Sequence, residues 1–131
     1  MVWSIDRRSL GEHGCALRFT ARNLGLGPAM VKERYFTSEG VKFEPSGHFS
    51  NEVREFLDVI LGQKVQYKVR QFGLPGTAAA LPAGGEHVIA DVEFPTISFD
   101  NVEVAAAYVG KAGFRMRYES MYGESFFLEA D

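Results

Sequence analysis

The sequence predicts a mainly β protein, a sandwich of seven to eight strands with one short α-helix. Short segments in which apolar and polar residues alternate recur at spacings of roughly 8–15 residues, which is typical of sandwiches and barrels. Turns rich in glycine and proline separate these segments. One segment carries the spacing of an amphipathic helix. A small barrel of the OB type, which also has a helix between strands, is the alternative.

The length of the chain, 131 residues, is that of one domain. Residues 1–14 are mixed in character, and Gly11 and Gly14 interrupt them, so a flexible arm or an edge segment is expected there. Residues 15–131 are expected to form the single β-sandwich domain.

The first two strands of that domain are predicted over residues 15–22 and 29–37, on either side of a glycine-proline turn. Alternation in the first strand is complete and assigns one face to the core and the other to solvent. The core positions are Cys15, Leu17, Phe19 and Ala21, and the solvent positions are Ala16, Arg18, Thr20 and Arg22. Cys15, the one cysteine, is therefore expected to act as a small buried hydrophobe rather than a reactive thiol.

A short strand over 41–43 is followed by the predicted helix at about 51–61. Its apolar residues follow the spacing i, i+3, i+4, i+7, i+8 of one helix face. They are Val53, Phe56, Leu57, Ile60 and Leu61. Ser50 or Asn51 can cap the start of the helix, and Gly62 suits a left-handed C-cap.

The second half of the chain is predicted to consist of strands. Alternation or apolar character predicts them over 65–69, 88–94, 102–109, 114–119 and 125–128. Residues 73–86 are rich in glycine, proline and alanine, and they form a long connection before the strand at 88–94.

Three motifs occur in a particular order along these predicted strands. They are Asn23-Leu-Gly-Leu-Gly-Pro-Ala29, Leu81-Pro-Ala-Gly-Gly-Glu86 and Arg117-Tyr-Glu-Ser-Met-Tyr-Gly-Glu124. In this order, and with a short helix between the first two, the chain resembles immunoglobulin-like β-sandwich domains of uncharacterised bacterial envelope proteins. The resemblance covers about residues 15–128. It implies an immunoglobulin-like topology and a domain that faces out of the cytoplasm, and it supplies no catalytic residue.

Six basic residues occupy polar positions of three predicted strands, and Tyr118 follows the last of them. The seven candidate binding residues are Arg18, Arg22, Lys32, Arg34, Arg115, Arg117 and Tyr118. If the three strands are neighbours, these residues make a basic and aromatic sheet face suited to an anionic ligand or partner. Solvated strand faces whose charges discourage edge aggregation are the plainer interpretation.

Signals for catalysis, cofactors and metals are weak. Gly25 and Gly27 lack the third glycine and the helix that a phosphate-binding loop needs. His13, His48 and His87 show no metal-ligand spacing, and no Gly-x-Ser-x-Gly nucleophile motif occurs. No cofactor and no metal is therefore expected, and the protein is predicted not to be an enzyme.

The predicted function is that of a non-enzymatic interaction or accessory domain of a bacterial envelope protein, which binds a protein or an envelope polymer. The alternative is a module that binds oligosaccharide or nucleic acid through the basic, aromatic face. The net charge of −3 disfavours nucleic acid as the first choice. No apolar run reaches the ~18 residues of a membrane span. The location is expected to be periplasmic if the chain is a trimmed domain, held at the membrane only by an anchor outside this sequence, and otherwise cytoplasmic.

Overall fold

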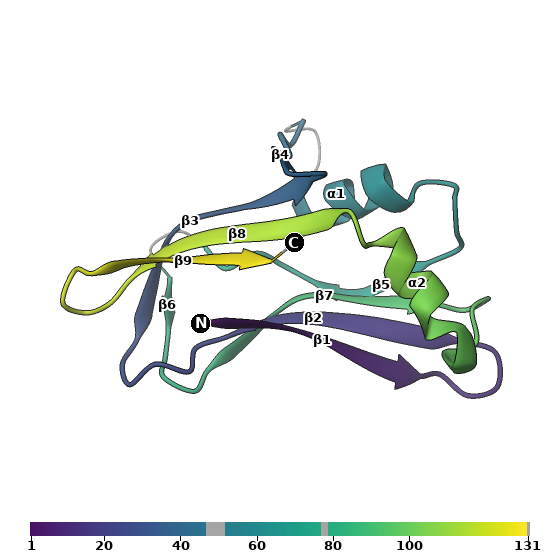
Figure 1. The fold of residues 1–131 in the computed structure, drawn as a ribbon, viewed down its shortest axis with the longest axis horizontal. Coiled ribbons are helices and arrows are strands. Elements are labelled where there is room, and N and C mark those ends of the chain that lie inside the picture. Colours follow the sequence, from purple (N-terminus) through teal and green to yellow (C-terminus); the bar gives the residue numbers. More distant parts are fainter. Residues whose placement is uncertain (47–51, 77–78, 131) are drawn as a thin grey trace.

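The computed structural model describes residues 1–46, 52–76 and 79–130, which form two antiparallel sheets packed face to face (Figure 1). The first sheet has the strand order β1-β2-β7-β5. Its strands are β1 (Val2–Ser9), β2 (Cys15–Arg22), β7 (Glu86–Phe94) and β5 (Lys68–Phe72). Every pair in this sheet is antiparallel, and the pleat of each strand places side chains alternately on the core face and the outer face. Two irregularities interrupt the pairing, one of β2 with β7 between Phe19 and Thr20 and one of β5 with β7 between Val69 and Gln71.

The second sheet has the strand order β4-β3-β8-β9, and a two-residue strand, β6, also pairs with β3. Its strands are β3 (Ala29–Ser38), β4 (Val41–Lys42), β6 (Ala80–Leu81), β8 (Ala112–Glu119) and β9 (Ser125–Ala130). One irregularity interrupts the pairing of β3 with β8, between Val31 and Glu33. The extra residue there reverses the side-chain alternation of β3 from that point on.

The order of strands is that of the immunoglobulin sandwich. In the usual lettering, β1, β2, β7 and β5 take the places of strands A, B, E and D, while β3, β8 and β9 take those of C, F and G. The short β4 lies beside β3 as strand C′. The predicted fold class, a mainly β sandwich, is confirmed. The OB-type alternative is wrong, since the sheets described by the structure do not close into a barrel.

The predicted helix is confirmed as α1 (Glu52–Leu61). It buries Val53, Phe56, Leu57 and Leu61 against the sheets. Gly62 follows with a φ of 49°, which lies in the left-handed region. Helices commonly end in this conformation, and glycine adopts it without the steric strain that a Cβ would cause. The predicted cap at Ser50 or Asn51 lies outside the described residues.

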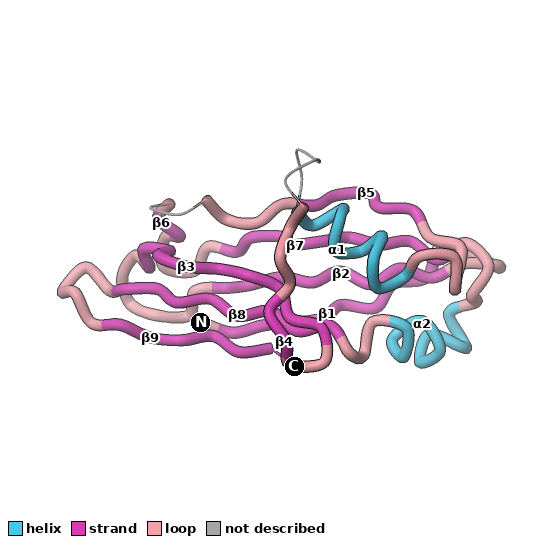
Figure 2. The backbone as a smooth tube through the Cα atoms, turned by 90° about the horizontal axis from the view of Figure 1, so that it is seen from above, coloured by secondary structure: helices cyan, strands magenta, loops and turns pink. Residues whose placement is uncertain are grey.

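The predicted strand over 102–109 is wrong, because this segment is helical. A short 3₁₀ turn (Phe99–Asn101) leads into α2 (Val102–Tyr108). Val102, Ala105 and Val109 are buried, which is one face of a helix, and the run of three alanines favours helix over strand. The protein therefore has two α-helices rather than one, and both lie at the same end of the sandwich (Figures 1 and 2).

The N-terminal residues form an edge segment and not a loose arm. β1 pairs with β2 over its whole length, from Val2 opposite Arg22 to Ser9 opposite Cys15. With β1 and β6 added and 102–109 removed, the described residues contain nine strands instead of the seven to eight expected.

Aromatic rings fill the space between the sheets. Phe36 stacks on Phe56 with ring centroids 4.4 Å apart, and Phe114 lies 5.6 Å from Phe36 and 5.3 Å from Trp3. Cys15 is fully buried in the same core, where burial raises the pKa of its thiol. Such contacts join the two sheets and α1 into one core.

Candidate functional site

The seven residues predicted to form one basic, aromatic face lie on two different sheets. Arg18 and Arg22 belong to β2 of the first sheet. The other five belong to β3 and β8 of the second sheet: Lys32, Arg34, Arg115, Arg117 and Tyr118. β3 and β8 are neighbours, but β2 lies across the core from them. The structure therefore brings together part of the group and separates the two arginines of β2 from the rest.

On the outer face of the second sheet, the basic residues alternate with carboxylates. Lys32 Nζ lies 3.9 Å from Glu119, and Arg117 lies 3.8 Å from Glu33 and 3.5 Å from Glu119. Arg115 is on the same face, opposite Glu129 of β9. Because the basic side chains and the carboxylates neutralise one another, this face attracts a polyanion only weakly.

Arg34 and Tyr118 point toward the core side of this sheet. Arg34 pairs in register with buried Met116, and its Nε donates a 2.8 Å hydrogen bond to the carbonyl of Pro75. Tyr118 is opposite Val31 and stacks on Phe126 at 5.6 Å between ring centroids. Burial raises the pKa of the Tyr118 hydroxyl. Arg34 thereby joins β3 to the segment around Pro75, and Tyr118 joins β8 to β9.

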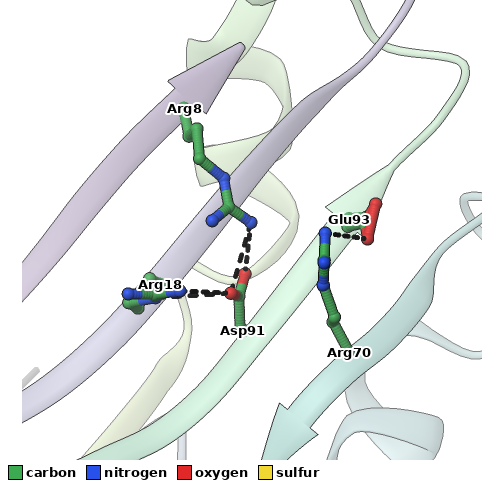
Figure 3. A network of polar contacts seen from close by, with 5 residues as sticks. All are labelled: Arg8, Arg18, Arg70, Asp91 and Glu93. Atoms are coloured by element: carbon green, nitrogen blue, oxygen red, sulfur yellow. Dashed lines mark hydrogen bonds and ion pairs between the residues drawn. The ribbon is translucent and has the colours of Figure 1, made fainter. Parts of the chain in front are cut away.

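Arg18 belongs to a polar network on the outer face of the first sheet (Figure 3). Arg8 and Arg18 both donate hydrogen bonds to Asp91, whose carboxylate is buried between them. Next to it, Arg70 lies 3.6 Å from Glu93. Arg8 and Arg18 cover Ala16, which is therefore buried although it was predicted to face solvent. Thr20, also predicted to face solvent, is buried as well, and its hydroxyl lies 2.6 Å from that of Ser4.

The turn between β2 and β3 is held by a single buried side chain, Asn23. Its amide nitrogen donates 2.9 Å hydrogen bonds to the carbonyls of Gly27 and Leu81, and its amide oxygen accepts one from the Gly25 N–H. The Asn23 backbone is also bonded to residues 84 and 85 of the β6–β7 turn. One residue thereby joins two turns through hydrogen bonds at the end of the sandwich opposite the helices (Figure 1).

The β8–β9 turn lies beside this pair of turns and is similarly ordered. The Ser120 hydroxyl accepts hydrogen bonds from the N–H groups of Tyr122 and Glu124. The two turns approach closely, because a Cβ placed on Gly27 would lie 3.5 Å from the sulfur of Met121. We call residues 23–28 and 120–124 together the loop end.

The loop end exposes large apolar side chains, and three of them, Leu26, Met121 and Tyr122, line a groove. Leu24, Leu26, Met121 and Tyr122 are all exposed, and Leu26 is exposed completely. The groove has a volume of about 600 Å³ and is lined by residues of both turns, by Phe126 and by the carboxylate-bearing Glu124. Glycine and proline in these segments predict turns, and the apolar residues at the turn tips are the signal in the sequence that points to a binding surface.

No protein-family model, curated protein or solved structure matches this chain. The resemblance to envelope domains therefore stays a prediction. Among the helices of the described residues, none is long and apolar enough to cross a membrane. Within those same residues, no three histidine, cysteine, aspartate or glutamate side chains come together as a metal site would need.

Proposed function

We propose that this chain is a non-enzymatic binding domain that holds a protein partner at its loop end. The observation that carries the proposal is the exposure of Leu26, Met121 and Tyr122 around one groove, with Leu24 exposed on the same turn as Leu26. Contiguous exposed apolar side chains on a soluble domain mark interaction surfaces. Tyrosine and methionine are also enriched in protein interfaces relative to the rest of the surface.

The order of the loop end supports the same proposal. Asn23 and Ser120 hold the two turns through buried or bridging hydrogen bonds. A surface that is already ordered loses less conformational entropy when a partner binds. Loops carried by a rigid sandwich are also a common location for binding residues.

Charge favours a protein partner over a lipid surface or a nucleic acid. Glu124 lines the groove, and Arg22 at the base of the turn lies opposite Glu86 in the sheet. A carboxylate in the groove repels phosphate groups, whereas a lysine or arginine of a protein can pair with it. The partner surface is therefore expected to combine an apolar projection with a basic side chain. The ion pairs of the second sheet do not favour the alternative ligands, oligosaccharide and nucleic acid.

Site-specific photo-crosslinking in the source cells tests this proposal. A photoreactive amino acid replaces Leu26 or Tyr122 at the loop end, and Val59 of α1, which is also exposed, serves as the matched control. One discrete adduct is expected from both loop-end positions and none from Val59, and Met121→Ser should weaken the adduct. Adducts of the same mass from Val59, or no adduct from either turn, would contradict the proposal.

The location follows separately. We propose that the domain is extracytoplasmic, as the envelope resemblance implies. Fractionation of source cells, with the mass of the polypeptide measured in each fraction, tests this. Recovery in the periplasmic or membrane fraction supports the location, while recovery of a 14.5 kDa product only in the cytoplasm contradicts it.

A further inference from the structure

A cavity of about 180 Å³ lies between the two sheets, at the end that carries both helices. Its walls come from both sheets and from α1 and α2, and its lining is almost entirely apolar. Aromatic rings contribute much of it: Trp3, Phe19, Phe36, Phe56 and Phe114. Side chains around an empty cavity lack van der Waals partners on one side, and an apolar ligand can supply these contacts. An apolar cavity of about 150 Å³ is large enough to bind benzene. The cavity therefore has room for a small apolar group.

The cavity opens to solvent beside the edge strand β1. Trp3, Ile5 and Arg7 occupy alternate positions of β1 on its core side and all line the cavity. Ile5 is exposed, and the Arg7 side chain is 44% exposed, so these two residues form the mouth. Among the described residues that line the cavity, Arg7 is the one with a charged side chain.

At this mouth, Arg7 forms an ion pair with Glu103 of α2. The Glu103 side chain is 72% exposed. An ion pair between exposed side chains contributes little to stability, since both groups are well solvated when apart. A carboxylate brought by a ligand can therefore replace that of Glu103 at small cost.

We propose that the cavity binds a small apolar monocarboxylate. The apolar part, about six to eight carbons given the volume, lies between the sheets. The carboxylate pairs with the Arg7 guanidinium, whose planar group of donors matches two carboxylate oxygens. This site is separate from the loop end, which lies at the other end of the sandwich, so it goes beyond the proposed partner binding (Figure 1).

Octanoate is the probe for the binding experiment, and octanol is its uncharged counterpart. Trp3 is the one tryptophan of the chain and lines the cavity, so its fluorescence reports entry of a ligand. Calorimetry on the full chain gives the stoichiometry. Saturable one-to-one binding of octanoate with a change in Trp3 fluorescence is expected, and octanol should bind more weakly.

Two surface variants separate the carboxylate contact from the cavity. Arg7→Gln should weaken octanoate binding about tenfold, because a charge-assisted pair is lost, and should leave octanol binding unchanged. Glu103→Gln should strengthen octanoate binding, since the competing carboxylate is gone. Arg22→Gln, an exposed arginine at the far end of β2, is the matched control and should change neither.

Filling the cavity gives a third test. Ala106 of α2 lines the cavity, and Ala106→Leu should abolish binding of both probes while the thermal unfolding midpoint is kept. The proposal is overturned if octanoate shows no saturable binding up to millimolar concentration. It is equally overturned if Arg7→Gln weakens octanoate and octanol alike, or if Ala106→Leu folds and still binds octanoate as well as before.

Discussion

Arg18 and Asp91 lie side by side on neighbouring strands, with Arg18 Nη2 3.0 Å from Asp91 Oδ2. Arg8 approaches the same carboxylate from the edge strand, at 3.1 Å. Asp91 is 1% exposed, whereas both arginines remain in contact with solvent. A carboxylate this deeply buried is stable only with such partners, and the network thereby fastens β1, β2 and β7 together.

Replacement of the central carboxylate should destabilise the fold. Asp91→Ala is expected to lower the free energy of unfolding by about 1–3 kcal/mol, because hydrogen bonds to a charged group are lost while the arginines regain water. Urea unfolding measures this. The matched control is Glu93→Ala, whose partner Arg70 is mostly exposed, and it should cost less than about 1 kcal/mol. Equal losses for the two variants would show that Asp91 is not special.

Asn23 should be as important for the loop end as Asp91 is for the first sheet. Asn23→Ala removes three hydrogen bonds of a buried side chain and should cost on the order of 2–4 kcal/mol. Asn23→Asp should cost at least as much, because the carboxylate cannot donate to the carbonyls of Gly27 and Leu81. Asn101→Ala, at an exposed asparagine whose side chain donates one hydrogen bond to the Ser98 hydroxyl, is the control and should cost less than about 1 kcal/mol. An unchanged free energy of unfolding in Asn23→Asp would contradict the role of the Asn23 amide nitrogen as a hydrogen-bond donor.

Local patterns predicted the strands well, but not which strands share a face. The alternation of Cys15, Leu17 and Ala21 describes β2 correctly, since pleating depends on neighbours in sequence. The separation of Arg18 and Arg22 from β3 and β8 follows from sheet order, which local alternation does not encode. The bulge after Val31 adds one residue, and this reverses the direction of Arg34.

Helix and strand were confused where polar residues were scarce. Residues 102–109 contain Ala105, Ala106 and Ala107, which fit either period. The helix propensity of alanine and the tertiary context decide together there: Val102 and Ala105 are buried on one side of α2, which contacts β2 of the first sheet. The apolar tips of the loop end and the charge of Arg7 were both visible in the sequence. Their exposure and their position at a cavity mouth needed the fold.

The helix α1 should depend on the burial of Phe56. Its ring stacks on Phe36 at 4.4 Å and contacts Phe43 edge-on at 5.1 Å. Phe56→Ala is therefore expected to cost about 3–5 kcal/mol in urea unfolding. Val59→Ala, at an exposed position of the same helix, should stay within about 0.5 kcal/mol. A loss below roughly 1 kcal/mol for Phe56→Ala would show that the apolar face of α1 is not buried in solution.

Alkaline pH should destabilise the protein through Tyr67. Burial, together with the hydrogen bond that its hydroxyl donates to Asp58, raises the pKa of Tyr67 from 10.0 to about 12. The folded protein therefore holds this proton at pH values where the unfolded chain has released it. The contribution to stability is complete below pH 10 and is lost progressively as the pH rises to about 12.

Tyr67→Phe should remove this pH dependence. Unfolding midpoints in urea between pH 9 and pH 12 measure it, and absorbance titration of tyrosinate in the folded protein should lose its step near pH 12. Tyr122→Phe, at an exposed tyrosine of the loop end, is the control and should keep that step, because Tyr67 is still present. The prediction is contradicted if Tyr67→Phe leaves both the absorbance step and the alkaline loss of stability in place. Another group would then titrate near pH 12. The contact between Tyr67 and Asp58 would then not be what holds α1 to the segment before β5.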